Sequence, residues 1–389
     1  MSYLRRISTR RLLALCAAIL VAGAGAAAIA MAAGGTGTTP PAKPLAQALH
    51  DALAAPPVEG VTARIAFTNH LIDAASLQGS DPLLTGATGR LWAAGDRLRL
   101  ELQASDARGG AGDVQVVVDG DRLSVIDSGS NTVYRATLPK RHPAGPVPSL
   151  ARIQDALTKL AAHADVSGAR PGDVAGQPAY TVRMSPSHDG GLLGGVEVAW
   201  DAEHGVPLRA AVYSSDSATP VLELQATKIS FGKVAAADLT LPDPAGAKVV
   251  DLSPPAATGP DGPPVTGLSA VQGKVSFGVV APDQLVGLPR KEVRLVDIGG
   301  TPGALVTYGQ GLGGIAVLES PAQPRSQAQP TPRGDHGGVS LPRISINGVS
   351  GEELDTALGT VVRFERGGIA YTIVGSVPPA AAEAAARAL

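Results

Sequence analysis

The chain has 389 residues; 44 % are hydrophobic, 17 % are charged and one is a cysteine, and 32 Lys and Arg against 34 Asp and Glu give a formal net charge of -2. This composition excludes a disulfide-stapled miniprotein and a zinc-cluster protein, and it argues against a strongly basic nucleic-acid binder. The hydrophobic content over this length can bury a sizeable core, so a fully disordered chain is also excluded, and we expect two domains.

The first 33 residues have the form of an export segment. Four arginines, Arg5, Arg6, Arg10 and Arg11, precede an uncharged apolar stretch over 12–33. That stretch is long enough to span a bilayer at about 20 residues per crossing, and small residues near its end also fit a cleaved signal peptide. We therefore expect either a signal peptide or a membrane anchor over 1–33. In both cases the remainder is extracytoplasmic, anchored in the cytoplasmic membrane or secreted after cleavage.

Apolar residues at helical spacing predict a helix from Pro44 to Ala55 and a second one of about four turns over 150–164. Elsewhere the period is two, as in half-buried antiparallel strands. The clearest strands cover 61–68, 97–102, 114–118, 123–125, 132–138, 180–184, 196–200, 208–213 and 221–231. One antiparallel sheet of about ten strands with two helices favours an α+β fold, in which helices pack against the concave face of an unclosed half-barrel.

A composition break then separates a second region. Residues 253–266 contain five prolines and two glycines, which continue neither strand nor helix. We expect a first domain over 44–250, a linker over 251–267 and a smaller β-rich α+β domain over 268–389. Its predicted strands cover 275–280, 293–297, 304–308, 315–319, 343–347, 361–365 and 370–374, and a helix covers 379–389. The Pro- and Gln-rich stretch between 320 and 338 is expected to be unstructured.

Motifs of catalysis are scarce in this sequence. Gly309, Gly311 and Gly314 form a GxGxxG, but the β-like run that follows ends at Pro321, so a glycine-rich hairpin is predicted instead of a nucleotide site. The seven histidines are scattered without metal-ligand spacing. We therefore predict no catalytic residue, no metal, no cofactor and no enzymatic activity. A hydrolase is kept only as a third hypothesis, after the two binding functions given at the end of this section.

The connection after the first strand, residues 71–84, is unusually apolar. It is too long for a tight hairpin and rich in Leu and Ile for a surface loop. It is either a mobile flap over a hydrophobic cavity or a loop that packs its leucines on the edge of the sheet. The flap residues would be Leu71, Ile72, Leu83 and Leu84.

Several runs resemble the LolA/LppX/RseB-type lipoprotein carrier family in the order and spacing of their elements. They cover 89–92, 96–100, 196–209, 231–232 and 241–247. The resemblance extends over about 44–250 and implies an unclosed β-barrel, capped by helices, that encloses an apolar cavity for the acyl chains of a lipoprotein or lipid. A carrier-like domain followed by a smaller β-rich domain resembles the MucB/RseB-type regulators, which bind an anti-sigma factor.

We therefore expect a non-enzymatic envelope protein that binds lipid or lipoprotein acyl chains in a half-barrel cavity. The alternative is an RseB/MucB-like regulatory protein that senses the envelope state and binds an anti-sigma factor or another membrane-anchored partner. Neither function involves nucleic acid. The predicted lining residues come from the inward stripes of the strands: Ile65, Phe67, Leu98, Leu100 and Val116. Without the leader the chain holds 28 basic and 34 acidic residues, a net charge of -6, so its attraction to anionic lipid headgroups is poor.

Overall fold

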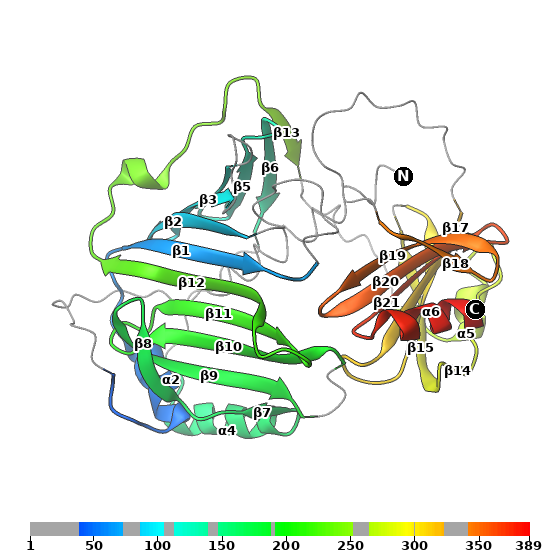
Figure 1. The fold of residues 1–389 in the computed structure, drawn as a ribbon, viewed down its shortest axis with the longest axis horizontal. Helices are drawn as coiled ribbons and strands as arrows, with labels where there is room; N and C mark the ends of the chain where they lie inside the picture. Colours follow the sequence, from blue (N-terminus) through cyan, green and yellow to red (C-terminus); the bar gives the residue numbers. More distant parts are fainter. Residues whose placement is uncertain are drawn as a thin grey trace.

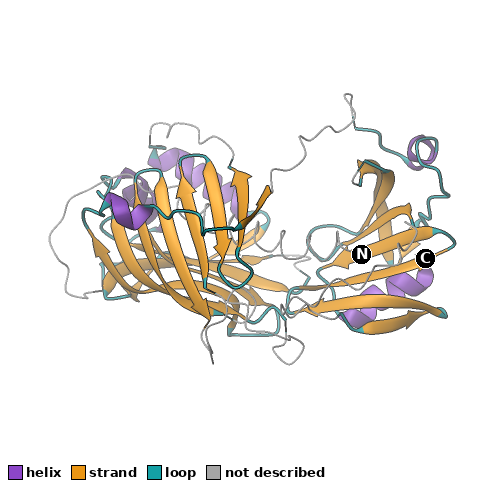
Figure 2. Ribbon diagram, turned by 90° about the horizontal axis from the view of Figure 1, so that it is seen from above, coloured by secondary structure: helices purple, strands orange, loops and turns teal. Residues whose placement is uncertain are grey.

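A computed structural model describes residues 39–72, 86–104, 113–138, 147–187, 191–251, 264–298, 300–322 and 341–389. In this part the chain is mostly β with few helices, and its strands form two sheets, which Figures 1 and 2 show side by side. The first sheet takes its strands from the chain up to Asp251 and the second from Gln284 onward. The predicted domain and linker boundaries stay a prediction, since residues 252–263 lie outside the described part.

The first sheet has 13 strands in the order β13-β6-β5-β4-β3-β2-β1-β12-β11-β10-β9-β7, with β8 paired to β9. Its central strand, β1 (Val61–Asn69), lies between β2 (Ala87–Ala94) and β12 (Pro220–Phe231). The other strands are β3 (Arg97–Ala104), β4 (Val114–Asp119), β5 (Arg122–Asp127), β6 (Thr132–Thr137), β7 (Ala164–Val166), β8 (Arg170–Val174), β9 (Gln177–Pro186), β10 (Leu193–Asp201), β11 (Pro207–Ser214) and β13 (Lys248–Asp251). All pairs are antiparallel except β13 with β6.

The predicted alternation is confirmed in this sheet. In β3 the leucines at 98, 100 and 102 are buried, whereas the charged residues between them face outward. The turn between β4 and β5 places Gly120 at φ 62°, a conformation that glycine adopts without strain. The sheet has more than the ten or so strands expected, because β7, β8 and β13 contain only three to five residues and are too short to show a period.

Two helices accompany the first sheet, as predicted. Helix α2 (Leu45–Ala54) packs Ala48 against Tyr180, Val182 and Trp200 of β9 and β10. Helix α4 (Leu150–Ala161) begins after Ser149, whose hydroxyl accepts the N–H of Arg152, and it packs against α2 and β7. It ends before residue 164, because the chain there enters β7. The short 3₁₀ helix η2 (Ala236–Leu239) packs against β2 and β3.

The second sheet has eight strands in the order β14-β15-β16-β17-β21-β20-β19-β18. They are β14 (Gln284–Leu285), β15 (Leu288–Asp297), β16 (Pro302–Tyr308), β17 (Ile315–Pro321), β18 (Arg343–Ile346), β19 (Val349–Thr356), β20 (Gly359–Arg366) and β21 (Ile369–Gly375). Helices α5 (Leu268–Gln272) and α6 (Pro379–Ala388) contribute to its core, α6 through three alanines with no exposed surface, Ala382, Ala385 and Ala386. The predicted glycine-rich hairpin is confirmed, since residues 309–314 join the antiparallel strands β16 and β17.

The strand predicted at 275–280 is wrong. Val275, Phe277 and Val279 pack against the second core, as their alternation suggests, but the backbone there pairs with no strand. The Gln272 side chain donates to the carbonyl of Phe277 at 2.7 Å and accepts from the N–H of Val279 at 2.8 Å. Side-chain hydrogen bonds thus replace a β ladder in this segment.

In the part of the chain that the structure describes, no helix is long and apolar enough to cross a membrane. The predicted leader, residues 1–33, lies outside that part.

Candidate functional site

One face of the first sheet, called here the inner face, is the face that packs against α2. Residues directly opposite one another in an antiparallel pair point to the same face. Across β1, β12, β11, β10 and β9 the opposite residues are Phe67, Leu224, Ala210, Val198 and Val182. Because Val182 belongs to the same apolar cluster as Ala48 of α2, the whole row belongs to the inner face. The opposite side of the sheet is called the outer face.

The structure brings the five predicted lining residues together on the inner face. Ile65, Leu98, Leu100 and Val116 belong to one apolar cluster, with exposed fractions from 0 % at Leu100 to 9 % at Leu98, and the half-buried Phe67 packs against it. Leu100 lies directly opposite Leu91 on β2 and Val116 on β4. The register of the stripes is therefore as expected, and the contact of these residues with a ligand stays a prediction.

The inner face is apolar over the central rows of five strands, β1 to β5. Their inner positions are Val61, Ala63, Ile65, Phe67, Ala87, Gly89, Leu91, Ala93, Leu98, Leu100, Leu102, Val114, Val116, Val118, Leu123 and Val125. Asn69 and Asp127 also take inner positions, at the ends of β1 and β5. Between them the surface offers a ligand dispersion contacts and burial. It therefore suits an aliphatic chain better than a polar substrate.

The predicted flap is described only at its start, because Leu83 and Leu84 lie outside the described residues. Leu71 and Ile72 are half-buried. The N–H of Leu71 donates to the Asn69 side chain at 2.9 Å, and its carbonyl accepts the N–H of Ala357 at 2.9 Å. Ala357 lies in the turn between β19 and β20, so the second sheet holds the base of this connection. The sequence carries no signal for such a contact between distant segments.

A second contact joins the two sheets at the turn that precedes β10. The N–H of Leu192 donates to the carbonyl of Ser376 at 3.1 Å and to its hydroxyl oxygen at 3.0 Å. The Ser376 hydroxyl in turn donates to the carbonyl of Leu358 at 2.8 Å. Because Leu358 is the neighbour of Ala357, both contacts reach the same end of the second sheet, where Figure 1 shows the two sheets meeting.

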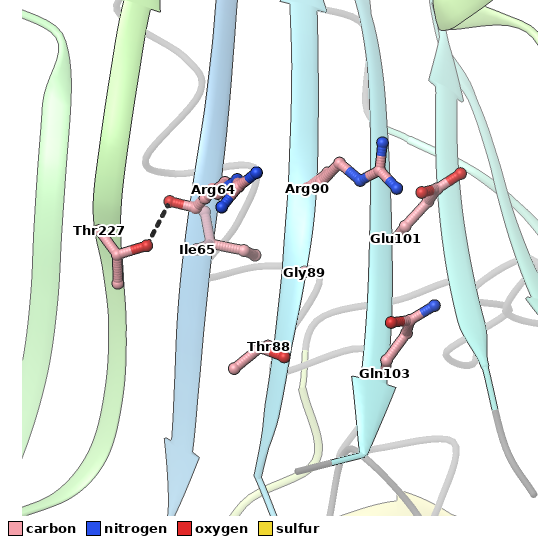
Figure 3. A pocket seen from close by; sticks show the side chains of 8 residues that line it. All are labelled: Arg64, Ile65, Thr88, Gly89, Arg90, Glu101, Gln103 and Thr227. Atoms are coloured by element: carbon pink, nitrogen blue, oxygen red, sulfur yellow. Dashed lines mark hydrogen bonds between the residues drawn. The ribbon is translucent and has the colours of Figure 1, made fainter. Parts of the chain in front are cut away.

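A polar pocket of about 520 Å³ lies on the outer face, on β12, β1, β2 and β3 (Figure 3). It is lined by Arg64, Ile65, Thr88, Gly89, Arg90, Glu101, Gln103 and Thr227. One feature of the backbone shapes it: β12 has a register shift beside Arg64 and Ile65, with Thr227 as the extra residue. Sequence reasoning treated these polar positions as an ordinary outward face and missed the pocket. The signal that could have found it is the pair of arginines at outward positions of neighbouring strands.

A buried Asp-His pair occupies the turn between β10 and β11. Asp201 is 1 % exposed and His204 7 %. The Asp201 carboxylate binds the backbone N–H of Glu203 and of His204 and also the His204 ring nitrogen Nδ1, at 2.7 Å. The His204 ring stacks on Phe231 at 4.1 Å between ring centroids. The pair thus closes a tight turn. Among the described residues, no group of three or more His, Cys, Asp or Glu is placed to hold a metal ion.

No protein-family model matches the chain, and no curated protein matches it. Solved structures with a related fold include the complex of MucA and MucB from Pseudomonas aeruginosa. That match has 20 % identity and a TM-score of 0.41, and it covers 88 % of this chain and 96 % of the other. A crystal structure of MucB in complex with MucA(peri) has 19 % identity and a TM-score of 0.40, covering 84 % and 91 %. A LolA superfamily protein from Nitrosomonas europaea has 10 % identity and a TM-score of 0.22, covering 51 % and 99 %.

These structures belong to both groups that the sequence resembles, the LolA-type carriers and the MucB-type proteins. The likeness concerns the fold. The function is argued below from the chain's own residues.

Proposed function

We propose that this chain is a non-enzymatic, extracytoplasmic envelope protein that binds acyl chains of a lipid or lipoprotein against the inner face of its first sheet. The observation that carries the proposal is the apolar character of that face over five neighbouring strands. Helix α2, with α4 packed on it, covers the other half of the inner face at β9 and β10, so the helices cap the half-barrel on that side.

The energetics suit an acyl chain. Each buried methylene contributes about 0.8 kcal/mol, so ten of them supply about 8 kcal/mol, the free energy of a micromolar complex. Ile65, Leu98, Leu100 and Val116 are at most 9 % exposed, so a ligand reaches them only when the groups that cover them move aside. We assign that movement to the connection 71–84, whose base is anchored at Leu71.

Phe67 offers the sharpest test, because it lies on the inner face but is only half-buried. We expect Phe67→Glu to abolish binding of a fluorescent fatty-acyl probe, because a carboxylate on this face loses its hydration without gaining a partner. Thr62→Glu is the matched control: it places the same charge on the same strand, at an exposed outer position, and should bind the probe like the wild type. Thermal melting of both variants shows whether they fold.

The native ligand is tested separately, by mass spectrometry of the protein purified from membranes. Wild type and Thr62→Glu should carry lipid, and Phe67→Glu should not. A wild-type protein that carries no lipid and binds no acyl probe would overturn the proposal. Equal probe binding by folded Phe67→Glu would overturn the assignment to this face.

A second candidate is a regulatory protein that binds an anti-sigma factor or another membrane-anchored partner. The observation that favours it is the bond between Leu71 and Ala357, through which the base of the predicted flap touches the second sheet. In that case the state of the connection would reach a partner held by the second domain. Recovery of an anchored regulator with the protein, unaffected by Phe67→Glu, would support this candidate over the carrier function.

A further inference from the structure

We propose that the outer face of the first sheet carries a second binding site, which takes an acidic peptide segment of a partner protein. The site consists of the polar pocket and the cations around it, on the side of the sheet opposite the proposed acyl site. We call the three residues Arg64, Arg90 and Lys228 the cation row.

The cation row is an unfavourable arrangement for an isolated sheet. Arg64 on β1 lies directly opposite Lys228 on β12 and directly opposite Arg90 on β2. Like charges at directly opposite positions destabilise a sheet. All three side chains are exposed, and none forms an ion pair with another described residue. Three adjacent strands thus present three positive charges without an ion pair across about 10 Å, given strand spacings of about 4.8 Å, although Glu101 lies directly opposite Arg90 on the next strand.

Two other cations on the same face form ion pairs. Arg99 pairs with Glu101, and Arg209 pairs with both Glu197 and Glu223. The cation row differs from them in that its three cations lie directly opposite one another and have no ion pair. It also stands out against a chain whose formal net charge is negative. An external anion would supply the missing partner.

The pocket beside the cation row supplies hydrogen bonds of both kinds. Thr88 and Gln103 line it with donors and acceptors, as does Thr227, whose hydroxyl donates to the carbonyl of Arg64 at 3.3 Å (Figure 3). Its floor includes the backbone of Ile65 and Gly89, two positions whose side-chain direction is the inner face.

The chemistry of the lining favours a peptide over a membrane. Guanidinium groups bind carboxylates through paired hydrogen bonds, and two carboxylates two residues apart in an extended peptide lie on the same face about 7 Å apart, within the width of the cation row. Thr88, Gln103 and Glu101 in the pocket can also bind the N–H and C=O groups of a peptide backbone, which a layer of lipid headgroups does not provide.

The test uses the full chain and a fluorescein-labelled Gly/Ser peptide with two glutamates two residues apart, measured by fluorescence anisotropy. A peptide with glutamines in their place is the matched control. We expect the acidic peptide to bind about tenfold more tightly than the neutral one, and to bind less tightly as NaCl rises from about 50 to about 300 mM. The double variant Arg64→Gln/Arg90→Gln should lose that difference.

Two controls keep the outcome decisive. Arg97→Gln/Arg122→Gln removes the same charge from exposed positions outside the pocket and should leave peptide binding within about twofold. Phe67→Glu should also retain it, which separates this site from the proposed acyl site. The Arg64→Gln/Arg90→Gln protein should melt no lower than the wild type, since it relieves repulsion.

Equal binding of the acidic and neutral peptides by the wild type would overturn the proposal, and so would undiminished preference in Arg64→Gln/Arg90→Gln. Vesicles with phosphatidylglycerol are the third arm. If they bind the wild type but not Arg64→Gln/Arg90→Gln, while the acidic peptide does not bind, the site is a membrane contact and the peptide proposal is wrong.

Discussion

Glu319 is a carboxyl group with no exposed surface in the core of the second sheet. One of its oxygens accepts the N–H of Val280 at 3.0 Å, and the other has no hydrogen-bond partner among the described residues. Burial raises the pKa of Glu319 to about 7 from its usual 4.5, although the Val280 bond acts in the opposite direction. The folded protein therefore binds a proton here at pH values where the unfolded chain has released it.

This residue makes stability depend on pH with a definite sign. The contribution of protonated Glu319 is complete below pH 4.5 and is lost as pH rises toward 7. Relative to Glu319→Gln, whose amide keeps the bond to Val280 without ionising, the wild type should lose up to about 3 kcal/mol of unfolding free energy between these limits. Urea unfolding of both proteins across this range measures the difference. A constant difference at all pH values would contradict the assignment.

At the scale of elements, the sequence predicts a strand best where a regular alternation of apolar and polar side chains marks its buried face. Leu98, Leu100 and Leu102 alternate with polar residues, and β3 forms with that stripe buried. The same period misleads at 275–280, because alternation reports which side chains are buried and not which backbone pairs with which. No strand is predicted at β19, although its backbone pairs with two neighbours. Glu352, Glu353 and Asp355 give this segment a polar composition that is uncommon in strands.

The two candidate sites differ in whether the sequence could predict them, for the same reason. The inner face follows from alternation, so its residues could be chosen before the structure. The outer pocket depends on which strands are neighbours, because Arg64, Arg90 and Lys228 come together only through the pairing of β1 with β2 and with β12. β12 is separated from β1 by more than 150 residues, and no local pattern reveals such pairing.

The turn between β10 and β11 positions α2 through Gly205. Gly205 has φ +66°, and a Cβ there would lie 2.3 Å from the carbonyl oxygen of Ala52 in the helix. Gly176 is a matched control, with φ +78° and open space around its missing Cβ. Gly176→Ala should cost about 1 kcal/mol for the backbone conformation alone, and Gly205→Ala about 3 kcal/mol because α2 must also shift. Chemical denaturation compares the two, and equal losses would contradict a packing role for this turn.

At the scale of the whole molecule, the described residues form separate cores. The apolar clusters of the first sheet contain no residue of the second, and the second cluster contains none of the first. Among the described residues, the hydrogen bonds between the sheets join Leu71 to Ala357 and Leu192 to Ser376. Such a junction is held by a handful of backbone groups, so it can open at much lower cost than either core.

Gly191 controls this junction, and its substitution tests the arrangement directly. A Cβ at Gly191 would lie 2.2 Å from the carbonyl oxygen of Ser376, whereas Gly246, with a similar positive φ, has nothing within 4 Å of its missing Cβ. Gly191→Ala should therefore separate the sheets, increase the radius of gyration in small-angle X-ray scattering and speed proteolysis near the junction, with both cores still folding. Gly246→Ala should change none of these readouts. If Gly191→Ala leaves the radius of gyration unchanged, the Leu192–Ser376 bonds do not fix the relative position of the two sheets in solution.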